Sequence, residues 1–121
     1  MIKNFLLVGL GGMLGSMLRL AVNIGFKSSS YPFSTFLVNI AGSFLIGIIF
    51  GISARNSQFD VNWRLFLATG ICGGFTTFSS LSAESIFLLQ QQRYSVFFLY
   101  LFLSIVLGLA ATWLGMTIVA K

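Results

Sequence analysis

The chain of 121 residues is 57% hydrophobic and 7% charged, and its mean hydropathy is +0.98. Soluble domains carry roughly 25% charged residues, so this composition excludes an ordinary soluble domain and indicates a polytopic α-helical membrane protein. The net charge of +5 comes from Lys and Arg residues spread singly between apolar stretches, which is typical of topology signals at membrane edges and argues against a nucleic-acid partner.

Reactive side chains are scarce. The chain has no His, one Cys (Cys72) and two acidic residues, Asp60 and Glu84. A catalytic triad, a haem site or a Cys/His metal cluster lacks its parts, and an intrachain disulfide lacks its second Cys. We therefore expect a protein that is not an enzyme.

Four apolar stretches follow one another, at about residues 2–26, 33–54, 63–90 and 94–119. Pro32 suits the first turn of the second one. Each stretch reaches the roughly 20 residues that a helix needs to cross the hydrocarbon. The sequence therefore predicts an all-α fold of four transmembrane helices, organised as a single four-span membrane domain over residues 1–121.

Basic residues are almost evenly divided between the two sides of this predicted bundle. The side of both termini has Lys3, Arg55, Arg64 and Lys121, and the other side has Lys27, Arg93 and Arg19. Four against three gives the positive-inside rule almost no bias, so we expect insertion in both directions, which permits an antiparallel dimer. Four short helices enclose little interior, so we expect any pathway to run between subunits.

Residues 70–82, within the third stretch, combine glycines with hydroxyl residues and are expected to interrupt the helix at its centre. Irregular backbone at bilayer depth is tolerated only where it is buried in protein or lines a wet cavity. Broken helices place ion and substrate sites near the membrane midplane. We interpret the segment as part of an ion pathway.

A ladder of hydroxyls follows this interruption. If the helix resumes after Gly74, then Thr76, Ser80 and Glu84 share one face. Ser79 and Ser82 flank that face. Hydroxyls can donate hydrogen bonds to anions or direct their oxygen toward cations, so the ladder leaves the sign of the ion open. A simpler alternative also stays open, in which each hydroxyl bonds back to a carbonyl of its own helix.

The interruption itself offers groups for ions of either sign. Freed carbonyls around Gly73 and Thr76 could hold a dehydrated monovalent cation, whereas the N-terminus of the resumed helix favours an anion. Phe75 and Phe78 lie in the same place, and the electron-poor edge of a ring can contact a small anion.

Other candidates lie outside the third stretch. Asn39, inside the second one, is either interhelical glue or a pathway donor. Arg19 and Glu84 are the ionisable groups nearest the interiors of the spans, although Arg19 could instead extend to the membrane surface. Ser104 in the fourth stretch has a modest claim to line the same route.

Three segments together resemble the CrcB/Fluc family of fluoride channels: residues 11–19 (GGMLGSMLR), 32–44 (PFSTFLVNIAGSF) and 70–79 (GICGGFTTFS). They occur in the right order in a four-span chain of suitable length. The resemblance implies a dual-topology antiparallel homodimer, a multi-pass protein of the cell inner (plasma) membrane. Two pores along the subunit interface would export fluoride passively and confer fluoride resistance.

The resemblance also implies roles for individual residues. A structural sodium ion would be held by main-chain oxygens of Gly73 and Thr76. The fluoride pathway would comprise Asn39, Phe78, Ser79, Ser80, Ser82 and Ser104, with Arg19 and Glu84 at the vestibules. The chain departs from the family pattern at Leu81, where a second pore phenylalanine is usual, and at Ser34, where glycine is common. Because Leu81 lacks a positive ring edge, a heterodimer with a paralogous chain is the alternative to a homodimer.

Two other functions compete with a fluoride channel. A proton-coupled exporter of the small multidrug resistance type has the same size and often the same dual topology. It needs a carboxylate inside the first helix, where this chain has only Lys3 and Arg19 as charges. A non-transporting assembly subunit would leave the interruption and the hydroxyl ladder without a purpose.

Overall fold

The computed structural model describes residues 1–26, 32–56 and 58–120, and every element in that part of the chain is a helix. The elements are α1 (Ile2–Gly25), α2 (Phe33–Arg55), α3 (Val61–Arg64), the π-helix η1 (Leu65–Cys72), α4 (Gly73–Phe75), α5 (Phe78–Gln90) and α6 (Tyr94–Ala120). Four segments are long and apolar enough to cross a membrane: Ile2–Gly25, Phe33–Arg55, Val61–Gln90 and Tyr94–Val119. The predicted four-helix membrane architecture is confirmed, while Lys27 and Lys121 lie outside the described residues.

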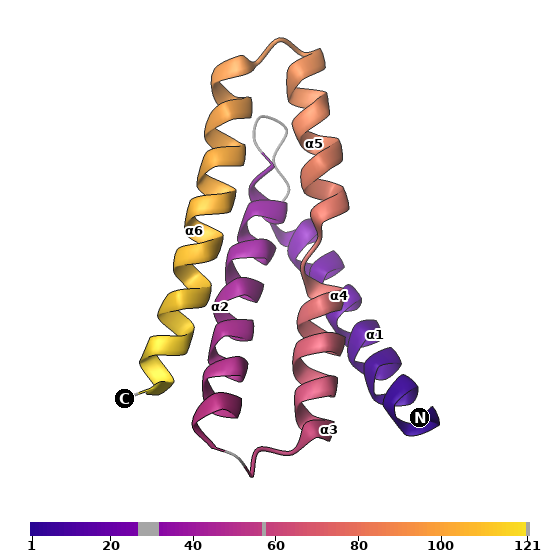
Figure 1. Cartoon of the computed structure of the whole chain (residues 1–121). Helices are drawn as coiled ribbons and strands as arrows, with labels where there is room; N and C mark the ends of the chain where they lie inside the picture. The colour runs from indigo at the N-terminus through magenta and orange to yellow at the C-terminus, as the bar shows by residue number, and fades with distance from the viewer. Residues whose placement is uncertain (27–31, 57, 121) are drawn as a thin grey trace.

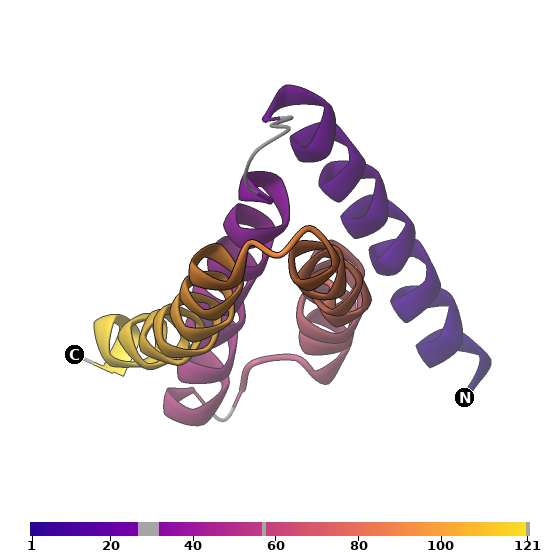
Figure 2. The same cartoon turned by 90° about the horizontal axis from the view of Figure 1, so that it is seen from above.

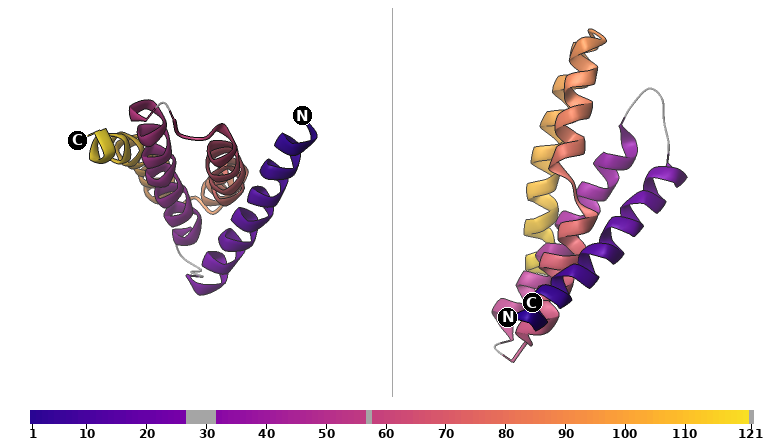
Figure 3. Two further views of the ribbon diagram at one scale, coloured as in Figure 1. Left: turned by 90° about the horizontal axis from the view of Figure 1, so that it is seen from below. Right: turned by 90° about the vertical axis from the view of Figure 1, so that its right-hand side faces the viewer.

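The four segments run alternately up and down, so that both termini lie at the same end of the molecule (Figure 1). Helix α2 packs mainly against α6, and α1 packs mainly against η1 and α4. Seen from above and below, α1 leans away from the other helices (Figures 2 and 3). The fold therefore consists of two closely packed helix pairs that meet at the middle of the third segment.

Glycines allow the close approach within each pair. A methyl group added at Gly74 of α4 would lie 2.5 Å from the carbonyl oxygen of Gly12 in α1. One added at Gly47 of α2 would collide with the Thr112 carbonyl of α6. This close contact of small residues is the usual way in which membrane helices pack, since lipid provides no hydrophobic drive for association.

The third segment bends at two extended residues, Thr76 (φ −82°, ψ 159°) and Thr77 (φ −153°, ψ 116°). Helical backbone continues through Gly73 and Gly74 to Phe75 and resumes at Phe78. The expectation that the helix breaks at its glycines and resumes after Gly74 is therefore wrong in position.

The reason is that Gly74 serves helix packing. Gly74 admits the backbone of α1, as described above, whereas Thr77 ends the helical pattern and caps the next helix. The Thr77 hydroxyl accepts a hydrogen bond from the backbone N–H of Ser80 at 3.1 Å, which satisfies an otherwise unpaired donor of α5. Thr76 consequently lies outside α5 and does not share a helical face with Ser80 and Glu84.

Few side chains are buried in a hydrophobic core. Leu81, Leu88 and Tyr100 form the one buried cluster of apolar side chains found in the described part of the chain, between α5 and α6. Many large apolar side chains are exposed, including Phe5, Phe78, Phe98 and Trp113. Such a surface is suited to contact with lipid or with another membrane protein, not with water.

Candidate functional site

A groove of about 390 Å³ lies beside the bend, where α2, the third segment and α6 meet. It contains five of the site residues expected from the sequence, namely Asn39, Gly73, Thr76, Phe78 and Ser104. Its lining comprises Asn39, Gly42, Ser43, Ile46, Cys72, Gly73, Thr76, Thr77, Phe78, Leu81, Ser104 and Ile105. Polar groups from three helices thus converge on one opening at the place where helical backbone is interrupted.

The side-chain amide of Asn39 forms two hydrogen bonds with the backbone of Thr77, and we call this pair of hydrogen bonds the clasp. Its oxygen accepts from the Thr77 N–H at 2.8 Å, and its Nδ2 donates to the Thr77 carbonyl at 3.1 Å. In a continuous helix, that N–H would pair with the carbonyl of Gly73, four residues earlier. The clasp therefore stabilises the bend and takes away the ordinary helical partner of the Gly73 carbonyl.

The carbonyl of Cys72, the residue before Gly73, accepts two hydrogen bonds. The Cys72 oxygen accepts from the backbone N–H of Thr76 at 3.0 Å and from its hydroxyl at 2.9 Å. The extended backbone of Thr76 then directs its own carbonyl away from the helical pattern. The Gly73 and Thr76 carbonyls, expected from the sequence to be released, both belong to residues that line the groove.

Ser104 contributes a buried hydroxyl whose oxygen has no hydrogen-bond partner among the described residues. A buried hydroxyl without a partner is unfavourable by about 1–3 kcal/mol. The residue lines the groove, so a small polar guest there would satisfy it. This is the clearest indication in the structure that the groove holds something other than protein.

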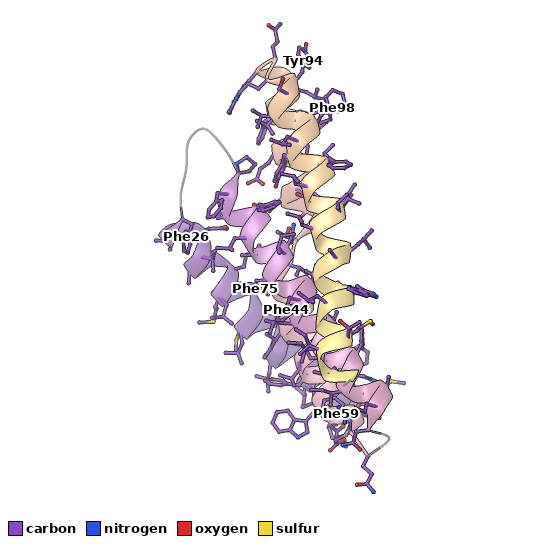
Figure 4. The ribbon with its side chains drawn as sticks, turned by 90° about the vertical axis from the view of Figure 1, so that its left-hand side faces the viewer. Phe26, Phe44, Phe59, Phe75, Tyr94 and Phe98 are labelled. Carbon is purple, nitrogen blue, oxygen red and sulfur yellow. The ribbon has the colours of Figure 1, made fainter. Side chains whose placement is uncertain are left out.

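Phe78, the first residue of α5, lines the groove and remains 79% exposed. Leu81 lies three residues after Phe78, at the position where the family pattern has its second phenylalanine. It is only 8% exposed and packs in the core cluster. Figure 4 shows Phe75 in the middle of the molecule, with Tyr94 and Phe98 toward one end and Phe59 toward the other. Phe78 therefore presents its ring at the surface of the chain, whereas Leu81 fills space inside it.

Glu84 lies on α5, two turns beyond the bend, and its carboxylate accepts two hydrogen bonds from neutral hydroxyls. Thr35 Oγ1 donates to one oxygen at 3.0 Å, and the Tyr100 hydroxyl donates to the other at 3.0 Å. Thr35 and Tyr100 are buried, at 3% and 0% exposure. In the part of the chain that is described, no Lys or Arg pairs with Glu84, so its partners there are the two hydroxyls, and the three residues form a polar cluster between α2, α5 and α6.

Thr35, Tyr100 and Thr77 were not among the sites expected from the sequence. A signal for the first two was present, because Thr35 precedes Asn39 by four residues and Tyr100 precedes Ser104 by four. Residues at this spacing lie on one helical face. Nothing in the sequence marked Thr77 as the residue that Asn39 binds.

The other expected site residues lie around the groove without lining it. The Ser79 hydroxyl lies 3.1 Å from the Thr77 hydroxyl, and Ser80 supplies the N–H that Thr77 caps. Ser82 is exposed on α5. Arg19 is partly exposed on α1, which contributes no residue to the groove.

Comparison with known proteins gives a consistent result. Residues 6–116 match the family described as "CrcB-like protein, Camphor Resistance (CrcB)". A protein of Flavobacterium psychrophilum named "Fluoride-specific ion channel FluC" is 45% identical over 98% of both chains. A protein of the same name from Azobacteroides pseudotrichonymphae is 44% identical over 95% of this chain and 94% of its own.

A third relative, "Fluoride-specific ion channel FluC 1" of Listeria monocytogenes, is 44% identical over 96% of this chain and 97% of its own. Identity of this degree across nearly the full length of each protein leaves no separate region unmatched. The chain belongs to the family of CrcB-like proteins.

Proposed function

We propose that the protein is a fluoride channel which exports fluoride passively, through pores at the interface of an antiparallel homodimer. The observation that carries the proposal is the 44–45% identity to proteins named fluoride-specific ion channels, over almost the whole of each chain. Those names describe channels and not enzymes, in agreement with the scarcity of catalytic side chains. We place the protein, as one four-span domain, in the inner (plasma) membrane.

The groove supports an anion pathway beside Asn39, Phe78 and Ser104. The unpartnered Ser104 hydroxyl is a hydrogen-bond donor for a small anion. The edge of the Phe78 ring adds a weak positive potential without solvating a cation. We extend the pathway along the hydroxyls of Ser79, Ser80 and Ser82, with Arg19 and Glu84 at its ends.

The position of Phe78 supports a pore between subunits. A ring with 79% exposure at the mouth of a groove would have lipid on one side in a monomer. A second copy could cover the opening and make it a closed passage. The nearly balanced positive charges at the two membrane edges permit a partner in the opposite orientation.

The bend supports a structural sodium ion at the Gly73 and Thr76 carbonyls. The Asn39 clasp removes the helical partner of the first carbonyl, and extended backbone redirects the second. Carbonyl oxygens are the ligands by which channels hold dehydrated monovalent cations. Two such carbonyls from each of two subunits would give four ligands.

The chemistry of fluoride makes a passive pore sufficient. Hydrogen fluoride is a weak acid that crosses lipid in its neutral form and ionises in a less acidic cytoplasm, where the anion is trapped. A membrane potential that is negative inside drives anions outward by about 2.3 kcal/mol per 100 mV. Export therefore requires no coupling carboxylate.

Efflux from proteoliposomes tests the proposal. We expect fluoride efflux far above chloride efflux, and no change when a proton gradient is imposed. Efflux that requires a proton gradient would instead indicate an exporter of the multidrug type. Absence of fluoride efflux from well-folded protein would leave the heterodimer or the assembly subunit.

Separate experiments test the assembly and the ion. Labelling of single cysteines on each side of the membrane should modify half of the copies from either side, because insertion is in both directions. Replacement of sodium by a large organic cation should lower the thermal stability of the detergent-solubilised dimer. Labelling from one side of the membrane only would contradict the antiparallel dimer. An unfolding temperature that does not depend on sodium would contradict the structural sodium ion.

A further inference from the structure

A second polar cavity shares no lining residue with the groove. It lies where α2 and α6 end, and both termini are at the same end of the molecule (Figure 1). It has a volume of about 670 Å³ and is lined by Ile52, Arg55, Asn56, Gln58 and Val119. None of these residues has a part in the pathway described above. Its walls combine a guanidinium and two amides with two aliphatic side chains.

Arg55 is fixed in this cavity by α6. Its Nη1 donates to the carbonyl oxygen of Val119 at 2.7 Å, which satisfies an unpaired carbonyl in the last turn of that helix. A guanidinium has five N–H donors in a rigid fork. One contact therefore holds the group in place while most of its donors remain directed elsewhere.

The positive charge at this end has no acidic partner within the described ranges. Arg64 donates through Nη1 to the Ser53 hydroxyl at 3.2 Å, so both arginines are bonded to neutral acceptors next to the end of α2. The nearby carboxylate of Asp60 accepts from the backbone N–H of Asn62 as a helix cap. With Asp60 counted, the two guanidiniums still leave an excess of one positive charge beside the cavity.

Trp63 indicates the depth of the cavity in the membrane. The side chain is 56% exposed in the short helix α3, directly before Arg64. Tryptophan is enriched at the membrane–water interface, where its ring sits at the level of the lipid headgroups. Because the cavity is at the same end of the bundle, we expect it to open at that level.

From this arrangement we propose that the cavity binds the phosphodiester of an anionic phospholipid. Arginine is suited to phosphate because its fork can donate two parallel hydrogen bonds. The amides of Asn56 and Gln58 offer further donors, and Ile52 and Val119 provide apolar contact for the start of an acyl chain. In an antiparallel dimer, each leaflet would meet one copy of this site.

Thermal unfolding of the purified full-length protein in detergent, titrated with lipid, tests this inference. Dioleoylphosphatidylglycerol should raise the unfolding temperature at a concentration at least tenfold lower than dioleoylphosphatidylcholine does. Arg55→Gln should weaken the response to the anionic lipid about tenfold, since a hydrogen bond to a charged group is usually worth 1.5 kcal/mol or more and 1.4 kcal/mol corresponds to a factor of ten. Arg93→Gln, which removes a charge at the opposite end, is the matched control and should respond as the wild type does.

A second variant avoids the loss of the Arg55–Val119 contact. Gln58→Glu keeps that hydrogen bond and adds a negative charge beside the cavity, so it should abolish the preference for anionic lipid while leaving the protein folded. Equal responses to the two lipids, or a response in Gln58→Glu equal to that of the wild type, would overturn the proposal. Stabilisation by inorganic phosphate alone at the same concentrations would identify a site for free phosphate and would also overturn it.

Discussion

Asn39→Asp is the substitution that tests the clasp most directly, because the two side chains have nearly the same shape. The carboxylate can still accept from the Thr77 N–H, as the amide oxygen does at 2.8 Å. It cannot donate to the Thr77 carbonyl, which lies 3.1 Å from Nδ2 in the present structure. The variant therefore replaces one hydrogen bond by a close contact between two oxygens that carry negative charge.

The size of the effect follows from these two contacts. At about 1 kcal/mol each, the two hydrogen bonds favour the closed clasp by about 2 kcal/mol, or roughly 97% of molecules. The variant loses about 1 kcal/mol, and an unpaired buried acceptor costs a further 1–3 kcal/mol. The closed fraction then falls to between about 50% and 3%.

The new carboxylate would also repel a fluoride ion that moves through the pathway. A negative charge about 4 Å from fluoride repels it by about 4 kcal/mol at an effective dielectric constant near 20. Added to the smaller closed fraction, this repulsion should reduce fluoride efflux by more than about 100-fold. The reduction should persist at saturating fluoride, because it acts on the pathway itself.

The assay is fluoride efflux from proteoliposomes, recorded with a fluoride electrode at equal protein content. Gel filtration in detergent verifies that the variant is folded and assembled. Asn4→Asp makes the same chemical change at an exposed position near the start of α1 and should leave efflux unchanged. Efflux of folded Asn39→Asp within threefold of the wild type would refute the role assigned to the clasp.

Three further substitutions follow from the same geometry. Phe78→Ile should reduce fluoride efflux at least tenfold while leaving the fold of the single chain intact, since the ring is 79% exposed there; Phe98→Ile, with 66% exposure, is the control and should retain full efflux. Ser104→Ala should lower efflux and raise the unfolding temperature, because it removes a buried hydroxyl without a protein partner, and a lower unfolding temperature would contradict that account. Gly74→Ala should destabilise the protein by about 1–3 kcal/mol through contact with Gly12, whereas Gly9→Ala meets nothing within 4 Å and should fold normally.

The four spans could be predicted because their signal is local. About 20 apolar residues in succession have few alternatives to crossing a membrane, and the charges and Pro32 mark where each crossing starts or ends. The position of the bend could not be predicted, because it depends on contacts between distant segments. Gly73 and Gly74 look like helix breakers in isolation, but both are helical, and the lack of a side chain at Gly74 allows the close approach of α1.

The site was predictable in its residue types and only partly in its geometry. Asn39 and Ser104 stood out as polar groups inside apolar helices, and both line the groove. The partners that define their chemistry come from other segments: Thr77 for Asn39, and Thr35 and Tyr100 for Glu84. Pairings across 16 to 49 residues of sequence cannot be deduced from one chain without its fold. The roles of these residues in transport stay predictions.

The π-helix η1 (Leu65–Cys72) should make the third segment tolerant of changes in length. A π-helical turn holds more residues than an α-helical one, so a single deletion there can be absorbed by conversion to ordinary α-helix. The same deletion in α2, between Thr35 and Asn39, would rotate one of these side chains by about 100° and separate it from its partner. Natural length variation in relatives should therefore concentrate just before the bend and avoid the second span.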